Sequence, residues 1–329
     1  ESRKSRTNSG RGRGQMTLLI QYTLIFASVL MLVALGGCFA ERSGVINIGL
    51  EGIMVIGALG GALVLKFMPV TVGAPVMVIT TVIVSALFGM IFSLLLAVAA
   101  INFKADQTIT GTAMNMLATA AATVAVKAMN TAASGGNDVS SDISYTRTKD
   151  LLLVHVGGFE LNWFMLVAVL CLIAAYVALY KTRFGLRLCA CGEHPQAADS
   201  VGINVYRMRY AGVLISGVLG GLGGIVYIIA GVSEWKFENG VAGFGFLALA
   251  VMIFGQWKPT RIALAALLFG FFRALGNVYS GFDLLSNLNL PSSVYNMLPY
   301  VISLVVLAFT SQKSRAPKAE GIPYDKGQR

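Results

Sequence analysis

Long apolar runs are the feature that most constrains how this chain can fold. A helix that crosses the hydrocarbon core of a bilayer needs about 20 mostly apolar residues. Only 12% of the residues are charged, about half the share in a soluble domain, so lipid must cover much of the surface. The sequence therefore predicts an all-α, polytopic integral membrane helix bundle over residues 17–311. Its candidate spans are 17–40, 45–66, 75–101, 109–130, 162–180, 210–231, 242–257, 261–282 and 295–311.

The 25 lysines and arginines give a net charge of +10, and most of them cluster outside these runs. Basic residues mark the cytoplasmic side of spanning helices. We therefore expect a basic cytoplasmic tail at 1–16, a cytoplasmic loop at 181–209 and a cytoplasmic tail at 312–329, whereas the more acidic loop 131–161 should face outward. No aromatic and basic surface of the kind that binds nucleic acid accompanies the charge. The basic residues of the loop and the last tail are Lys181, Arg183, Arg187, Arg207, Arg209, Lys313, Arg315, Lys318, Lys326 and Arg329.

The number of runs before the outward loop conflicts with a cytoplasmic N-terminus. Four candidate spans precede 131–161, and an odd number of crossings is needed, unless the N-terminus lies outside. The weakest candidate is 45–66, which carries Asn47 and Glu51 and is interrupted by glycines. Non-helical backbone at membrane depth is tolerated only where protein or a water-filled cavity satisfies it. The prediction is about eight full spans plus one re-entrant or broken helix.

A faint repeat points to a second element of the same kind. Gly44-Val45 followed by Gly49 recurs as Gly240-Val241 followed by Gly245. The repeat predicts two equivalent elements that enter from the same side and run in the same orientation.

Five polar side chains within the apolar runs are candidates for the wall of a solute path: Asn47, Glu51, Asn115, Arg273 and Asn277. A charge at membrane depth costs about 2.5–3.5 kcal/mol on insertion scales, so such groups face a cavity or a partner. Glu51 and Asn47 either border a translocation path or form a structural pair or cap. Asn115 suits an interhelical amide. Arg273 and Asn277 are four residues apart and should share a face that points into the bundle, where Arg273 is a possible partner for Glu51.

Residue patterns that would carry catalysis or hold a metal are missing from the sequence. No G-x-x-x-x-G-K-[ST] motif occurs, so the chain cannot hydrolyse ATP by that route. The two histidines fall in separate loops, and Cys189-x-Cys191 lacks the second pair that a zinc site needs. The glycines of 210–231 indicate helix packing. We expect no enzyme, no metal and no cofactor in this chain.

The loop 181–209 contains the pattern of a short helix. Pro195 suits its first turn, Gln196–Val201 continue it, and Gly202 can end it. Such a helix could be a rigid docking knob, although an ordinary basic loop held by lipid headgroups is also compatible with this composition.

Three stretches resemble one known family. Glu41 to Gly52, the loop from Gly192 to Ile203 and the tail Gly321 to Lys326 are similar to permease subunits of bacterial ABC importers of the ribose/branched-chain-amino-acid class, in the nucleoside-type branch. The resemblance implies that the loop couples to an ATPase through Gly192, Glu193, Pro195, Ala197, Ala198, Asp199 and Gly202.

The resemblance also implies partners. They are a second, different permease chain, cytoplasmic ATPase subunits that bind ATP and Mg, and an extracytoplasmic solute-binding lipoprotein, at the bacterial plasma membrane. Two alternatives from other classes remain: a secondary transporter driven by an ion gradient, with Glu51 as its coupling carboxylate, and a passive channel.

Overall fold

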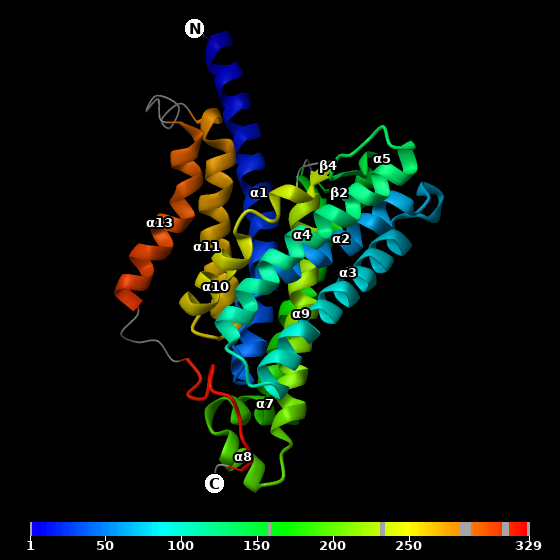
Figure 1. Cartoon of the computed structure of the whole chain (residues 1–329). Helices are drawn as coiled ribbons and strands as arrows, with labels where there is room; N and C mark the ends of the chain where they lie inside the picture. The colour runs from blue at the N-terminus through cyan, green and yellow to red at the C-terminus, as the bar shows by residue number, and fades with distance from the viewer. Residues whose placement is uncertain (1, 157–158, 231–233, 283–290, 311–315, 328–329) are drawn as a thin grey trace.

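All nine apolar runs are helices in the computed structural model, which describes residues 2–156, 159–230, 234–282, 291–310 and 316–327 (Figure 1). Over these residues, seven helices are long and apolar enough to cross a membrane, and one apolar helix, α10, is shorter. The prediction of an all-α polytopic bundle is confirmed. The nine helices are α1 (Ser2–Arg42), α2 (Leu50–Phe67), α3 (Ala74–Ala97), α4 (Gln107–Ser134), α6 (Trp163–Lys181), α9 (Val205–Ile229), α10 (Phe244–Phe254), α11 (Pro259–Val278) and α13 (Ser292–Thr310).

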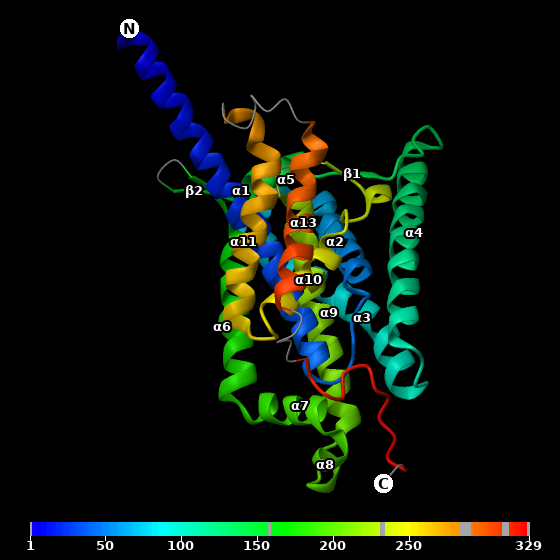
Figure 2. The same ribbon diagram turned by 90° about the vertical axis from the view of Figure 1, so that its left-hand side faces the viewer.

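The two tails lie at opposite ends of the bundle. α1 starts at one end and runs to the other, where α7 (Arg183–Glu193), α8 (Pro195–Ser200) and residues 316–327 gather (Figures 1 and 2). We call this the α8 end, and the opposite one, which carries 131–161, the loop end. The expectation that both tails share one side is therefore wrong, because 1–16 lies at the loop end. Of the basic tail residues, Lys313, Arg315 and Arg329 lie outside the described residues.

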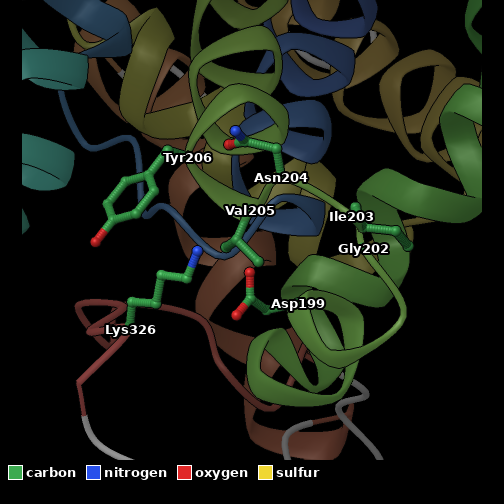
Figure 3. A pocket seen from close by; sticks show the side chains of 7 residues that line it. All are labelled: Asp199, Gly202, Ile203, Asn204, Val205, Tyr206 and Lys326. Atoms are coloured by element: carbon green, nitrogen blue, oxygen red, sulfur yellow. The ribbon is translucent and has the colours of Figure 1, made fainter.

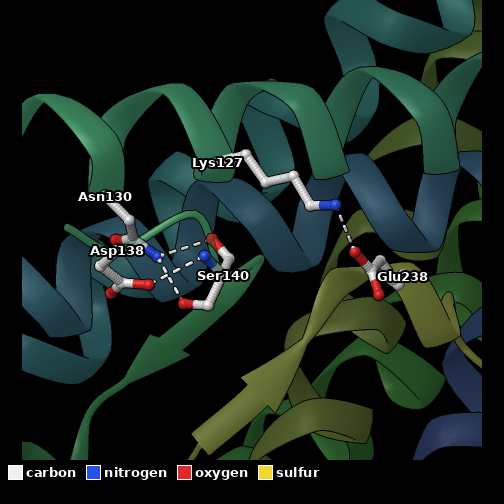
Figure 4. Close-up of polar contacts among 5 residues, drawn as sticks. All are labelled: Lys127, Asn130, Asp138, Ser140 and Glu238. Carbon is white, nitrogen blue, oxygen red and sulfur yellow. Dashed lines mark hydrogen bonds and ion pairs between the residues drawn. The ribbon is translucent and has the colours of Figure 1, made fainter. Parts of the chain in front are cut away.

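Short strands and turns close the loop end. β1 (Asp142–Ser144) pairs antiparallel with β4 (Glu234–Lys236), and β2 (Leu153–Val156) pairs with β3 (Phe159–Asn162). Side chains of α4 hold these segments in place: the Asn130 amide donates to the backbone oxygen of Ser140, and Lys127 pairs with Glu238 at 2.6 Å (Figure 4). Asn130 also donates to the backbone oxygen of Asp142. The remaining short elements are η1 (Val70–Val72), η2 (Val98–Asn102), α5 (Thr146–Lys149), η3 (Asp150–Leu152), η4 (Phe237–Asn239) and η5 (Tyr279–Gly281).

Glycine allows α2 and α9 to pack with almost no space between their backbones. A Cβ on Gly57 would lie 2.2 Å from Gly221 Cα, and one on Gly224 would lie 1.9 Å from Met54 O. Small residues permit such close approach between spanning helices. The packing role predicted for the glycines of 210–231 is confirmed, and α1, α2, α3 and α9 form the buried core around this contact.

Two helices begin inside the bundle. The chain breaks at 43–49 before α2, as predicted, and again at 240–243 before α10, which has 11 residues and spans about 16 Å. α10 is thus too short for the full crossing expected of 242–257. α2 runs toward the loop end, where Thr148 bonds Leu65 O, whereas α10 ends at the α8 end, where Trp257 bonds Glu41. The two elements therefore run in opposite directions, and the predicted common orientation is wrong.

Candidate functional site: a polar junction between two helix starts

Glu51 joins the start of α2 to the start of α10. Its Oε1 accepts a hydrogen bond from Gly243 N at 2.7 Å and its Oε2 accepts one from Gly245 N at 2.6 Å. The first amides of a helix have no partner within the helix, and the helix dipole makes that end positive. Because Glu51 also lies in the first turn of α2, one carboxylate faces the positive ends of two helices.

Amide side chains hold the break before α2. Asn115 of α4 accepts from Gly52 N at 2.8 Å and donates to Ile48 O at 3.0 Å. Asn47 is fully buried, and its Nδ2 donates to Ser216 of α9 at 2.8 Å. Asn47 Oδ1 has no hydrogen-bond partner among the described residues. The hydrogen bond between helices expected of the Asn115 side chain is present, and it binds the backbone at the break before α2.

Of the two remaining candidates, only Arg273 reaches this junction. Its guanidinium lies over the rings of Phe26 and Phe244, at 5.8 and 5.4 Å from their centroids. Asn277 is exposed, so the expectation that it points into the bundle is wrong: although it shares a face with Arg273, it lies in the last turn of α11, which ends at Val278.

Tyr300 belongs to the same junction, although the sequence did not single it out. Its hydroxyl donates to Ala242 O at 3.2 Å, and Ala242 has a left-handed backbone with φ +52°. Tyr300 lies in the middle of α13, where nothing in the sequence sets it apart, and only the fold brings it to the break before α10. The junction thus combines one carboxylate, one guanidinium, two amide side chains, one phenol and the main-chain groups that they bond.

The predicted helix in the loop 181–209 is present as α8, which starts at Pro195 and ends at Ser200. Gly202 follows with φ +82°, and Ile203 N returns to Ala198 O at 3.1 Å. Pro195 and Ala198 are buried, whereas Gln196, Ala197 and Ser200 are exposed, and Glu193 and Asp199 are half-buried. α8 therefore presents one face outward at the end of the bundle. Gly192 is packed so closely that a Cβ there would lie 2.3 Å from Arg42 O.

Arg209 has a different environment from the one its position in a basic loop predicted. Its side chain is 1% exposed, and Nη1 donates to Ile322 O at 2.9 Å. The sequence does not reveal this, because Arg209 is one of five basic residues in the loop and nothing in the pattern sets it apart.

Comparison with known proteins decides the family. The protein-family model described as "Branched-chain amino acid transport system / permease component" matches residues 19–307. The chain belongs to this permease family. It is 40% identical to the guanosine ABC transporter permease protein NupQ of Bacillus subtilis, over 95% of this chain and 98% of that protein. It is 39% identical to the nucleoside ABC transporter permease protein NupC of Lactococcus lactis, over 94% and 98%. No solved structure matches the chain.

Membership in this family makes the chain a multi-pass permease component of an ABC transporter, a part that moves solute rather than an enzyme. Among the residues that the structure describes, no group of three or more histidine, cysteine, aspartate or glutamate side chains is placed to hold a metal ion.

Proposed function

We propose that this chain is the permease subunit of an ATP-driven importer that brings nucleosides into the cell. The observation that carries the proposal is similarity along nearly the whole chain to permeases named for guanosine and for nucleosides. α8, with its outward face of small and polar side chains, is the element that would dock on a cytoplasmic ATPase carrying ATP and Mg. The α8 end is then cytoplasmic, the loop end and the N-terminus face outward, and a solute-binding lipoprotein delivers solute at the loop end.

The solute path passes the junction between the helix starts. Glu51, Asn115, Asn47 and Arg273 border it, and they act mainly by holding the two breaks open rather than by binding solute tightly. When the ATPase closes, α8 moves as a rigid body and the bundle changes between two packed arrangements. Asn277, which is exposed in the single chain, belongs to this path only if a second permease covers it.

We propose that a second permease packs against α4, and the difference between α4 and α3 supports this. α3 exposes large aliphatic side chains, including Ile79, Ile83, Leu87 and Ile91, and buries the small and polar Thr81, Ser85, Gly89 and Ser93. α4 exposes the small residues Thr108, Thr112, Ala113, Ala120 and Ala121 beside the larger Ile109, Met116, Leu117 and Val124, so its outer face mixes small and large side chains where that of α3 is large throughout. Small and hydroxyl-bearing residues mark helix–helix contacts in membranes. α4 also stands at the edge of the bundle (Figure 2).

The relatives support a partner that differs from this chain. The chain is 39% identical to NupC and 24% identical to the nucleoside ABC transporter permease protein NupB of the same organism. Two related permeases in one organism fit a heterodimer. Replacing Ala120 and Ala121 of α4 by leucine should abolish co-purification of the second permease, whereas Leu87→Ala on α3 should leave it intact. Equal recovery for both variants would show that α4 does not form the interface.

Uptake of labelled nucleoside by proteoliposomes tests the function. We expect the complete complex to accumulate nucleoside when ATP is inside and binding protein outside, and not to do so without ATP. Robust accumulation driven by an imposed proton gradient alone would instead establish the secondary transporter. The geometry does not favour that alternative, since both Glu51 oxygens already accept backbone hydrogen bonds. The panel should include guanosine, other nucleosides, ribose and an amino acid.

A further inference from the structure

α8 is too short to be stable alone. It has six residues, whereas isolated helices shorter than about 12–15 residues are marginal in water. Its stability must come from packing, and its buried face packs into a small cluster separate from the main core. The cluster consists of Cys191, Ala198, Val205 and Tyr324. Three of these belong to α7, α8 and α9, and the fourth belongs to the C-terminal strap, as we call residues 316–327.

The strap holds the α8 region by three further contacts. Ala319 N donates to Gly192 O at 2.8 Å, and the buried Arg209 donates to Ile322 O at 2.9 Å. The ring of Tyr324 meets that of Tyr206 edge-on at 5.3 Å. Figure 3 shows Lys326 of the strap and Asp199 of α8 lining the same open pocket of about 280 Å³. The strap therefore helps to support α8 and the segments next to it.

The same strap is bonded to the membrane helices. Gly321 N donates to Gly44 O at 3.3 Å, at the break that leads to Asn47 and Glu51. Asp325 pairs with Lys104 at 2.7 Å, directly before α4. The strap thus touches α8 on one side and, on the other, the two elements that bring polar groups to the junction.

We propose that the C-terminal strap connects α8 mechanically to the break before α2 and to the start of α4, with Tyr324 as the positioning residue of this connection. The ring of Tyr324 is 4% exposed, so it fills space between α8 and α9 rather than offering a docking surface. The role of the strap in transport rests on the proposed function, whereas its packing against α8 does not. We expect the strap to move together with α8 and α4 during a transport cycle.

Three variants in one segment test this. Tyr324→Ala removes the ring from the cluster and Tyr324→Phe keeps it. Ile322→Ala is the matched control, because Ile322 is 57% exposed and only its backbone oxygen serves Arg209. If the strap positions α8, only Tyr324→Ala of these three variants should lose function.

The first readout is the reactivity of Cys191, which needs no partner protein. Burial raises the pKa of the Cys191 thiol to about 11, so the folded chain holds little thiolate at pH 8 and reacts slowly with maleimide. We expect Tyr324→Ala to label Cys191 at least 10-fold faster, and Tyr324→Phe and Ile322→Ala to label it at the wild-type rate. A wild-type labelling rate in Tyr324→Ala would overturn the proposal.

The second readout is nucleoside taken up per ATP hydrolysed by the complete complex. We expect Tyr324→Ala to keep its ATPase subunits and to hydrolyse ATP while this ratio falls at least fivefold. Lost ATPase binding with unchanged Cys191 labelling would make Tyr324 a docking residue and overturn the proposal. If the wild-type complex shows no ATP-driven uptake, the proposed function fails, and the labelling result still decides whether the strap holds α8.

A cross-link covers the case in which Tyr324→Ala does not fold. Lys104→Cys with Asp325→Cys, in a chain whose four native cysteines are replaced, can be joined by a bifunctional methanethiosulfonate that spans the gap left by the ion pair and ties the strap to α4. We expect the cross-linked protein to transport as fast as the same protein after reduction, because the strap and α4 move together. A block that reducing agent relieves would show that the strap detaches in each cycle and would overturn the proposal.

Discussion

The two helices that begin inside the bundle are held by different chemistry, and the backbone explains why. At α10, the amides of Gly243 and Gly245 point toward one place, and both need an acceptor. A carboxylate has two acceptor oxygens and no donor, so Glu51 satisfies both. At α2, the break leaves a free amide at Gly52 and a free carbonyl at Ile48. A side-chain amide such as that of Asn115 can accept from one and donate to the other, whereas a carboxylate can only accept.

The difference also explains why a charge is tolerated at this depth. An isolated carboxylate would be costly among apolar helices. Glu51 accepts two main-chain bonds at 2.7 and 2.6 Å and lies in the positive first turn of its own helix. The α2 break presents one group of each kind, so it needs no charge. The residue type at each break thus follows from the balance of donors and acceptors left by the chain.

Removing the carboxylate should have the largest effect. Glu51→Ala leaves the amides of Gly243 and Gly245 without this acceptor, at about 1–3 kcal/mol each, so we expect a loss of about 2–6 kcal/mol in stability and at least a 10-fold loss of uptake. Glu51→Gln keeps one acceptor oxygen but turns an N–H group toward an amide, and should lose about half as much. Thermal unfolding in detergent measures the first quantity.

Glu51→Gln also separates two roles for this carboxylate. If that variant is as stable as the wild type and yet transports nothing, the charge acts on solute or protons rather than as a cap. The break before α10 would then not require a carboxylate as a backbone acceptor.

Replacing the amide should cost less. Asn115→Ala removes one acceptor and one donor at the break before α2. Because both hydrogen bonds are between neutral groups, each is worth about 0.5–1.5 kcal/mol, less than a bond to a carboxylate, and we expect a loss of about 1–3 kcal/mol. Asn115→Asp keeps the acceptor for Gly52 but sets a carboxylate beside Ile48 O, so it should be no better than alanine. Thr112→Ala, on the exposed face of the same helix, is the control. An Asn115→Asp variant as stable as the wild type would show that the two breaks do not differ in what they require.

The sequence predicts the helices of this fold well, because hydropathy is a local property. It also finds Glu51 and Asn115, since a polar group within an apolar run is conspicuous. It cannot find their partners: Glu51 binds amides at 243 and 245, and Asn115 binds Gly52 and Ile48 across two helices. The predicted side of residues 1–16 was wrong because it rested on their basic residues alone, whereas in the structure these residues extend α1 at the loop end. The strap was missed because Tyr324 gains its role only from packing with α8.

The glycine at the α2 break should be harder to replace than its conformation alone suggests. Gly44 has φ +95°, and a Cβ there would lie 2.9 Å from Nη2 of the buried Arg209. A left-handed backbone costs a residue with a Cβ about 1–2 kcal/mol, and Gly44→Ala should lose at least that much in thermal unfolding. The strap contact at Gly321 should loosen with it, which faster labelling of Cys191 would report. An unchanged melting temperature would contradict this.

The α10 break predicts the opposite sign for the same kind of exchange. Ala242 holds φ +52° although it has a Cβ, and its methyl group is exposed. Ala242→Gly removes the left-handed strain, while the greater freedom of glycine in the unfolded chain offsets part of the gain. We expect a net stabilisation of about 0.5–1 kcal/mol, the smallest of these effects, with the Tyr300 bond to this carbonyl preserved. If Ala242→Gly instead destabilises the protein, the alanine favours the native conformation of the break over other conformations. Both breaks would then depend on which residue holds the left-handed position, Gly44 at one and Ala242 at the other.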